Sequence, residues 1–189
     1  LPPWRRTTPD GAPYWTKNYQ PGVPIDIELP TESLCSLLDT AVREAGNHVA
    51  TQFFGAEMTY RELGDRVARA AEGLRRLGVH AGDRVAILLP NCPQHLIAFY
   101  AIVRLGAIVV EHNPLYTAPE LEKLFADHGA RVAIALDASI DKLNQLPIYE
   151  RPTQIVAINL LNAFPRHLQL ALRLPLPGLR AKKKALTSG

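Results

Sequence analysis

The chain has 189 residues, of which 47% are hydrophobic and 21% charged, and its formal net charge is +3. This composition is typical of a globular protein that can bury one core. Residues 160–189 hold six basic side chains and no acidic one, so the rest of the chain carries a formal charge of −3. Because nucleic-acid-binding domains carry basic charge on the folded body, we expect no nucleic-acid partner.

The sequence also limits where the protein can reside. No apolar stretch approaches the roughly 18 residues that a membrane-spanning helix needs, and no signal peptide is recognisable. Cys35 and Cys92 lie far apart without the spacing of a metal site, so we expect two reduced, buried thiols. These features predict a cytoplasmic protein.

The first part of the chain reads as an arm followed by a helix and a hairpin. Residues 1–30 hold seven of the 16 prolines, which predicts an extended arm whose tryptophan and tyrosine side chains lie against the body. An apolar face at helical spacing predicts a helix over 34–45. Residues 49–54 and 57–59 predict a β-hairpin with its turn at Gly55-Ala56.

Three helix–glycine–strand units follow. Thr59 and Glu62 form a predicted capping box that opens a helix ending at Gly78, and Thr117 and Glu120 form a second that opens a helix ending at Gly129. The first helix is expected to bury one apolar stripe, formed by Leu63, Val67, Ala70, Leu74 and Leu77. Further helices are predicted over 93–105 and 138–146, and strands over 84–89, 107–111, 131–136 and 154–158.

These strands begin 23 or 24 residues apart, which is enough for one helix and two short turns between parallel strands. Continuous apolar strands between amphipathic helices predict an α/β fold with a parallel sheet covered by helices on both faces. The expected organisation is an arm at 1–30, an α/β subdomain at 31–159, and a basic amphipathic segment with a linker at 160–189.

The loops at the carboxyl ends of these strands are where a ligand would bind. His112 and Tyr116 could supply a base or a substrate contact, but without an evident partner for His112 we favour the reading that both rings pack. Asp83, Asp127 and Asp137 are expected to serve turns rather than a metal. The chain has no GxGxxG and no GxxxxGK followed by Ser or Thr, so neither glycine-rich phosphate loop is present.

The basic tail allows a second kind of contact. Arg173, Arg180, Lys182, Lys183 and Lys184 lie among leucines, and apolar residues with a cationic complement suit the surface of an anionic membrane. The alternative is a surface helix and a solvated linker, which Pro175 and Pro177 favour because they interrupt a helix. Peripheral contact with the inner membrane face through 160–189 is therefore a hypothesis to test.

Four segments resemble one enzyme family in their order and spacing. Thr59-Tyr60-Arg61-Glu62-Leu63 is similar to the first core motif of adenylate-forming enzymes. Residues 82–91 (GDRVAILLPN) resemble that family's second strand and its exit loop, and residues 104–110 (RLGAIVV) resemble its second core motif. Residues 113–117 (NPLYT), with Glu120-Leu121, are similar to the bacterial long-chain fatty acyl-CoA ligases. The resemblance covers roughly residues 20–160.

The resemblance implies an enzyme that couples a fatty acid to ATP with the help of Mg²⁺ and then transfers the acyl group to CoA. It also implies that this chain is an N-terminal scaffold that is inactive alone, because the family's phosphate loop, nucleotide-binding segments and catalytic lysine have no counterpart here. Thr187-Ser188-Gly189 resembles the start of such a loop only superficially. No catalytic, cofactor-binding or metal-binding residue is therefore assigned.

Two other functions stay open from the sequence. The chain could be a stand-alone α/β binding or interaction module without catalysis, or part of a relative that activates aryl or amino acids. A homodimer surface is a further expectation. Half of a larger sheet should also leave an apolar patch uncovered.

Overall fold

The computed structural model describes residues 7, 9 and 11–172. The chain divides into two compact units, Leu1–Glu32 and Ser33–Gly189. In the first unit, the short 3-10 helix η2 (Tyr14–Asn18) begins after Pro13, whose carbonyl accepts bonds from the backbone amide and the hydroxyl of Thr16. Tyr14, Trp15 and Tyr19 are each more than 40% exposed. The arm therefore contains one helical turn that the proline content did not predict.

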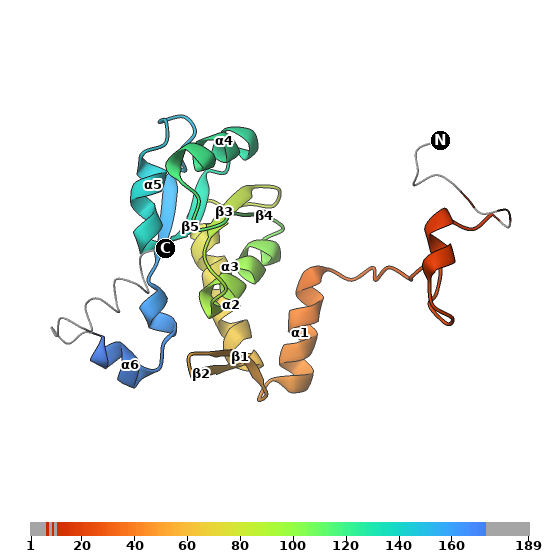
Figure 1. Cartoon of the computed structure of the whole chain (residues 1–189). Helices are drawn as coiled ribbons and strands as arrows, with labels where there is room; N and C mark the ends of the chain where they lie inside the picture. The colour runs from red at the N-terminus through yellow and green to blue at the C-terminus, as the bar shows by residue number, and fades with distance from the viewer. Residues whose placement is uncertain (1–6, 8, 10, 173–189) are drawn as a thin grey trace. The chain divides into compact units, whose positions relative to one another are not determined.

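The second unit is an α/β structure (Figure 1). Its elements in chain order are α1 (Leu34–Ala45), β1 (Val49–Phe53), β2 (Ala56–Thr59), α2 (Tyr60–Arg76), β3 (Arg84–Leu88), α3 (Pro93–Arg104), β4 (Ile108–Glu111), α4 (Ala118–His128), β5 (Val132–Leu136), η3 (Asp137–Ser139), α5 (Ile140–Asn144), β6 (Gln154–Ile158), η4 (Leu160–Ala163) and α6 (Arg166–Ala171).

Within the described residues, four strands form a parallel sheet in the order β4-β3-β5-β6. Strand β3 is central: Val85 pairs with Val109 of β4 on one side and with Val132 of β5 on the other. Such a sheet must be covered on both faces, because consecutive residues inside its strands are apolar. The predicted α/β class and parallel sheet are confirmed.

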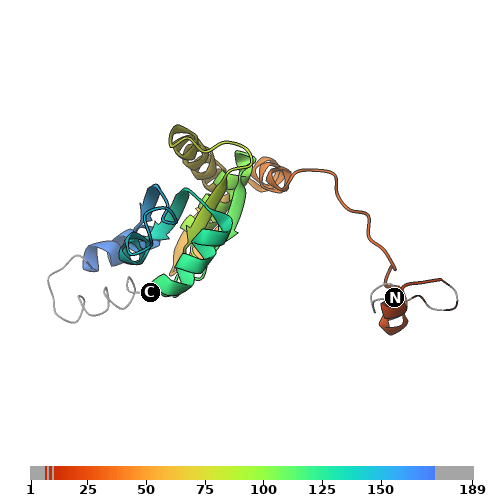
Figure 2. The ribbon, with the colours of Figure 1, turned by 90° about the horizontal axis from the view of Figure 1, so that it is seen from above.

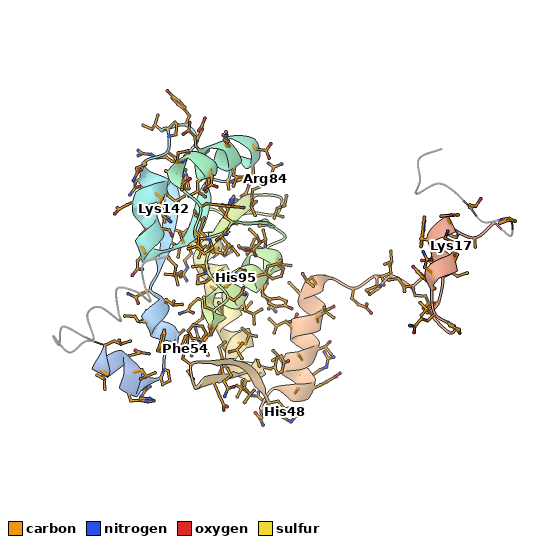
Figure 3. The ribbon with its side chains drawn as sticks, viewed as in Figure 1. Lys17, His48, Phe54, Arg84, His95 and Lys142 are labelled. Atoms are coloured by element: carbon orange, nitrogen blue, oxygen red, sulfur yellow. The ribbon has the colours of Figure 1, made fainter. Side chains whose placement is uncertain are left out.

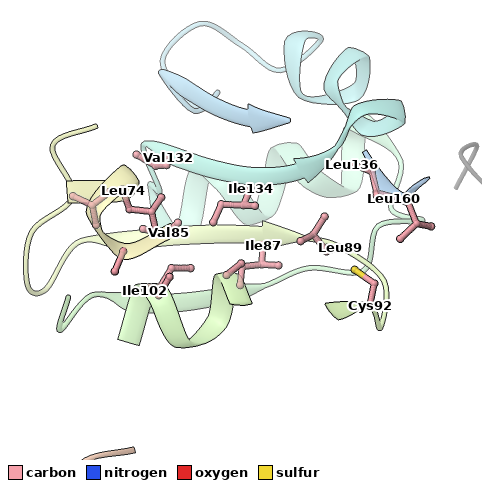
Figure 4. Packing of buried hydrophobic residues seen from close by; sticks show 14 of the residues in the cluster. Leu74, Val85, Ile87, Leu89, Cys92, Ile102, Val132, Ile134, Leu136 and Leu160 are labelled. Atoms are coloured by element: carbon pink, nitrogen blue, oxygen red, sulfur yellow. The ribbon is translucent and has the colours of Figure 1, made fainter. Parts of the chain in front are cut away.

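The side chains of β3 alternate between two hydrophobic clusters. Val85 and Ile87 face a cluster that includes Leu74 of α2 and Ile102 of α3 (Figure 4). Ala86 and Leu88 face the opposite cluster, which contains residues of α4 and α5. Because successive residues of a strand point to opposite faces, helices on both sides of the sheet bury β3 from Val85 to Leu88. The prediction of helices on both faces is therefore confirmed.

Helix α2 begins with the predicted capping box. The amide of Thr59 donates to the Glu62 carboxylate at 2.9 Å, and the amide of Glu62 donates to the Thr59 hydroxyl at 3.3 Å. The predicted apolar stripe is partly wrong. The buried residues of α2 are Leu63, Val67, Ala71 and Leu74. Ala70 lies at the edge of the stripe, and Leu77 follows the last helical residue and is 38% exposed. Gly78, with φ of 85°, ends the helix as predicted.

Helix α1 lies beside α2 and α3 (Figure 2). Leu38 of α1 joins Leu63 and Val67 of α2 in a third buried cluster, and Arg104 of α3 forms an ion pair with Asp39 of α1. The hairpin β1–β2 contributes Met58 to the same cluster. These contacts attach the hairpin and α1 to the helices that cover the sheet.

The hairpin turn differs from the prediction by one residue. Phe54 and Gly55 form the turn, with φ of 49° and 85°, and Ala56 already pairs with Phe53. Positive φ at both central residues suits the twist of a two-residue hairpin, and Gly55 adopts it without steric cost. The predicted turn at Gly55-Ala56 was therefore wrong, since Ala56 is a strand residue.

The region after β5 also differs from its prediction. The helix expected over 138–146 is the short 3-10 helix η3 followed by α5. The amide of Ala138 donates to the Asp137 carboxylate at 2.9 Å. This local side-chain bond competes with a regular α-helical start, which accounts for the tighter first turn.

An apolar groove of about 440 Å³ is lined by α2 and α3 and by the strands β5 and β6. Leu74, Ile97, Ile134 and Val156 line it. Helices α2 and α3 thus leave part of this sheet face uncovered, in line with the expected apolar patch.

Candidate functional site at the carboxyl edge of the sheet

The carboxyl ends of β3, β4 and β5 meet along one edge of the sheet. From β3 the chain passes through α3 to β4, whereas from β5 it passes through α5 to β6 on the opposite side. The crossovers therefore diverge between β3 and β5, and ligands of open α/β sheets bind at such a point. The loops there are 89–92 and the start of η3.

An open hollow of about 450 Å³ adjoins this edge at the start of α3. Cys92 is the N-cap of α3, His95 lies in its first turn, Phe99 and Tyr100 lie further along the helix, and Glu111 is the last residue of β4. Because α3 starts where β3 ends and β4 lies beside β3, the parallel register brings His95 and Glu111 to the same edge.

His95 joins the loop after β3 to the end of β4. Its Nε2 lies 3.0 Å from Glu111 Oε1, and its Nδ1 lies 3.3 Å from the carbonyl oxygen of Pro90. His95 is labelled in Figure 3. Both partners are oxygen acceptors, so both hydrogen bonds form together only when the ring carries two protons. The pair links the start of α3 to the end of β4 at the mouth of the hollow, and it uses one of the two carboxylate oxygens of Glu111.

Sequence reasoning did not identify this pair. The two residues are sixteen positions apart and belong to no motif. The strand order could have predicted it. The helix that follows one parallel strand begins at the same edge of the sheet where the neighbouring strand ends.

The two thiols differ in exposure. Cys92, the N-cap of α3, is buried as expected, whereas Cys35 is only partly buried, and both are free. Burial raises the pKa of the Cys92 thiol, and the backbone amides of His95 and Gln94 offset this only in part. Since a thiolate is the reactive form of cysteine, this environment favours a packing role for Cys92.

His112 and Tyr116 take the packing role that we favoured. His112 is 6% exposed and its ring stacks on Phe125 of α4, with centroids 5.4 Å apart. Tyr116 packs against the cluster that contains Phe125. His112 does have a partner that the sequence did not reveal, because its Nε2 lies 3.0 Å from Nε2 of His128. Burial, with a smaller effect of His128, lowers the pKa of His112 to about 4, so the ring is a weak base.

The three candidate aspartates behave differently from one another. Asp83 accepts the amide of His80 at 2.7 Å, and Asp137 accepts the amide of Ala138 and, at 3.0 Å, the side-chain amide of Asn159. These are the turn roles that we predicted. Asp127 was placed wrongly, because it lies in the last turn of α4 and not in a turn beside a strand.

Among residues 7, 9 and 11–172, no three His, Cys, Asp or Glu side chains come together in a way that could hold a metal ion. No helix in that part of the chain is long and apolar enough to cross a membrane. The proposed membrane-facing residues Arg173, Arg180 and Lys182–Lys184 lie outside the described residues, as does Thr187-Ser188-Gly189.

Comparison with known proteins places this scaffold in a family. The long-chain-fatty-acid–CoA ligase of Bacillus subtilis (strain 168) is 32% identical over 151 residues, which are 80% of this chain and 27% of the ligase. The chain thus spans about a quarter of that relative's length.

Two crystal structures have the same fold over most of this chain. The N-terminal domain of FACL13 from Mycobacterium tuberculosis gives a TM-score of 0.64 at 26% identity, covering 70% of this chain and 35% of that one. The anthranilate CoA ligase AuaEII in complex with anthranoyl-AMP gives a TM-score of 0.62 at 30% identity, and the match covers 69% of this chain and 26% of that ligase. Residues 38–174 match the family described as AMP-binding enzyme. The chain therefore belongs to the AMP-binding enzymes of the adenylate-forming superfamily.

Proposed function

We propose that this chain is the N-terminal scaffold of an ATP-dependent fatty acid–CoA ligase. In the complete protein, an acyl-adenylate would form first and a CoA thioester second. The observation that carries this proposal is the match to the Bacillus subtilis ligase over 80% of this chain. The scaffold would comprise an arm at 1–30, the α/β subdomain at 31–159 and the basic segment at 160–189.

We further propose that the 189 residues alone do not activate an acid. Activation requires positioned charge around the reacting phosphate. Three polar side chains at the described carboxyl edge already have partners within the chain: Glu111 bonds His95, Asp137 bonds Asn159, and Lys142 bonds the carbonyl of Pro114. Lys142 is labelled in Figure 3.

ATP, Mg²⁺ and CoA are the co-substrates that we expect for the complete protein. The donor set described above does not fit a metal ion, since it lacks a group of three ligand side chains. We therefore derive no metal or nucleotide step from the residues of this chain. Its role in catalysis would be to support the sheet edge against which the remaining residues assemble.

An ATP–pyrophosphate exchange assay tests the proposal. The chain is incubated with ATP, Mg²⁺, labelled pyrophosphate and a long-chain fatty acid, and the Bacillus subtilis ligase serves as the positive control. We expect acid-dependent exchange by the ligase and none by this chain. Acid-dependent exchange by the 189 residues would show that the scaffold proposal is wrong.

Two alternative functions make different predictions. The likeness to an anthranilate CoA ligase favours an aryl acid as the substrate class of the complete protein. A stand-alone interaction module would instead require a stop codon directly after the codon for Gly189. A reading frame that continues into a phosphate-loop sequence would exclude that module.

We also propose a cytoplasmic protein that contacts the inner membrane face through 160–189, and a homodimer. Co-sedimentation with anionic vesicles tests the membrane contact, with neutral vesicles as the control. Replacing Lys182, Lys183 and Lys184 by alanine should weaken binding to anionic vesicles, and unchanged binding would rule out this contact. Sedimentation equilibrium tests the homodimer.

A further inference from the structure

The pair His112–His128 connects the loop after β4 to the end of α4. The two Nε2 atoms are 3.0 Å apart, and Phe125 lies against both rings, with centroid distances of 5.4 Å to His112 and 4.6 Å to His128. The backbone of His112 is itself fixed, because its amide donates to the carbonyl of Ile87 in β3. The pair is thus a polar contact inside an aromatic stack that holds α4 on the sheet.

The hydrogen bonds determine where the protons lie. The amide of Ala130 can only donate, and it lies 3.0 Å from Nδ1 of His128, so that nitrogen carries no proton. A neutral His128 must then hold its proton on Nε2 and donate it to His112. Nε2 of His112 is therefore the acceptor, and its own proton lies on Nδ1, which is buried and has no hydrogen-bond partner among the described residues.

This arrangement leaves no position for an additional proton. A proton on Nε2 of His112 would face the N–H of His128, and a proton on Nδ1 of His128 would face the N–H of Ala130. Either one replaces a hydrogen bond with two opposed donors. We propose that His112 and His128 form an acid-sensitive latch, which holds the end of α4 against the loop after β4 while both rings are neutral and releases it when either is protonated.

The surrounding charges do not reverse this behaviour. Burial is the largest effect and lowers the pKa of both rings. Asp127 of α4 raises the pKa of His128 and Arg84 of β3 lowers it, so the two partly cancel. From α5, Lys142 donates to the carbonyl of Pro114, two residues beyond His112.

The direction of the pH dependence follows. Well above pH 6.5, the ordinary pKa of histidine, both rings are neutral whether the latch is closed or open, and the stability of the closed latch is fully present. Between about 6.5 and 4, the open latch binds a proton that the closed latch does not, so the closed state loses stability as the pH falls. Lowering the pH from 7.5 to 5 should therefore raise the open population at least about thirtyfold, the factor that His112 gives alone, because His128 acts in the same direction.

Two NMR measurements on the whole 189-residue chain test the latch. Long-range nitrogen–proton spectra at pH 7.5 should show the Nε2–H form of His128 and the Nδ1–H form of His112. Amide exchange, corrected for intrinsic rates, should show that the last turn of α4 opens at least about thirtyfold more often at pH 5 than at 7.5. The amides in the middle of α2 provide the reference within the same spectra.

The variant His112→Gln retains an acceptor for the Nε2–H of His128 but does not titrate at position 112. It should remove most of the pH-dependent opening of α4. The matched control is His48→Gln, because His48 is exposed and labelled apart from the sheet in Figure 3, and it should leave the opening unchanged. Opposite tautomers, an α4 whose opening does not change with pH, or an unchanged rise in His112→Gln would each overturn the proposal. If the variant does not fold, the histidine tautomers and the pH dependence of amide exchange in the unmodified chain still test the proposal.

Discussion

The ring of Phe54 stacks on the ring of Phe164, with centroids 4.7 Å apart and planes 22° from parallel. Phe53 meets the same ring edge-on at 5.5 Å. The hairpin turn between β1 and β2 is thereby joined to the segment after β6, 110 positions further along the chain. These aromatic contacts fasten the hairpin to the cluster on the α2–α3 side of the sheet, because Phe164 also belongs to that cluster.

Replacing Phe164 by alanine should therefore be strongly destabilising. Phe164 is 5% exposed, and truncating a buried phenylalanine typically costs about 3–5 kcal/mol. Phe54→Gly should change the free energy of unfolding far less, because Phe54 is 60% exposed and glycine relieves its positive φ. Urea unfolding measures both, and equal losses would contradict the packing that we describe.

Two glycines of α2 provide a matched pair. A methyl group on Gly73 would meet no atom within 4 Å, so Gly73→Ala should stabilise the helix by about 1 kcal/mol. A methyl group on Gly64 would lie 2.9 Å from Cγ2 of Val42, a stiff side chain of α1. Gly64→Ala should therefore destabilise the protein, and thermal unfolding should shift in opposite directions for the two variants. A shift in the same direction would show that α1 does not approach α2 so closely.

The capping box at Thr59 offers a test of local structure. Thr59→Ala removes the acceptor for the Glu62 amide and should cost about 1 kcal/mol of unfolding free energy. The comparison is Thr51→Val, since the buried hydroxyl of Thr51 has no partner among the described residues and its loss should be neutral or stabilising. If Thr59→Ala has no effect, then the cap does not contribute to α2.

Acid should weaken this capping box and the second one, formed by Thr117 and Glu120. Hydrogen bonds from Thr59 hold the pKa of Glu62 below its ordinary value, and Thr117 does the same for Glu120. A lowered carboxyl pKa means that this stabilisation is present above the ordinary value of 4.5 and is lost as the pH falls through the folded value. NMR titration of the two side-chain carboxyl carbons should show both midpoints below 4.5. Midpoints at or above 4.5 would exclude the bonds.

The sequence predicted most of the second unit because its signals are local. The Thr59–Glu62 box, the left-handed glycines and the apolar strands each depend on residues within one turn or one strand of each other. The turn at Phe54-Gly55 was misplaced because phenylalanine rarely adopts positive φ, so the pattern pointed one residue too far.

The candidate site was less predictable because its contacts are long-range. His95 meets Glu111, and His112 meets His128, across sixteen residues in each case. Neither spacing is a helical or strand period, so only the strand order and helix directions bring these side chains together. The family resemblance, by contrast, rested on contiguous motifs and was confirmed by the match over residues 38–174.

A chimera tests the central claim most directly. The 151-residue region of the Bacillus subtilis ligase that matches this chain is replaced by the corresponding residues of this chain. Circular dichroism and thermal unfolding first establish that the chimera is folded. CoA thioester formation is then measured with a long-chain fatty acid and with anthranilate. Our account predicts thioester from the fatty acid by the chimera and none by the 189-residue chain alone. A folded chimera that forms no fatty acyl thioester would contradict it.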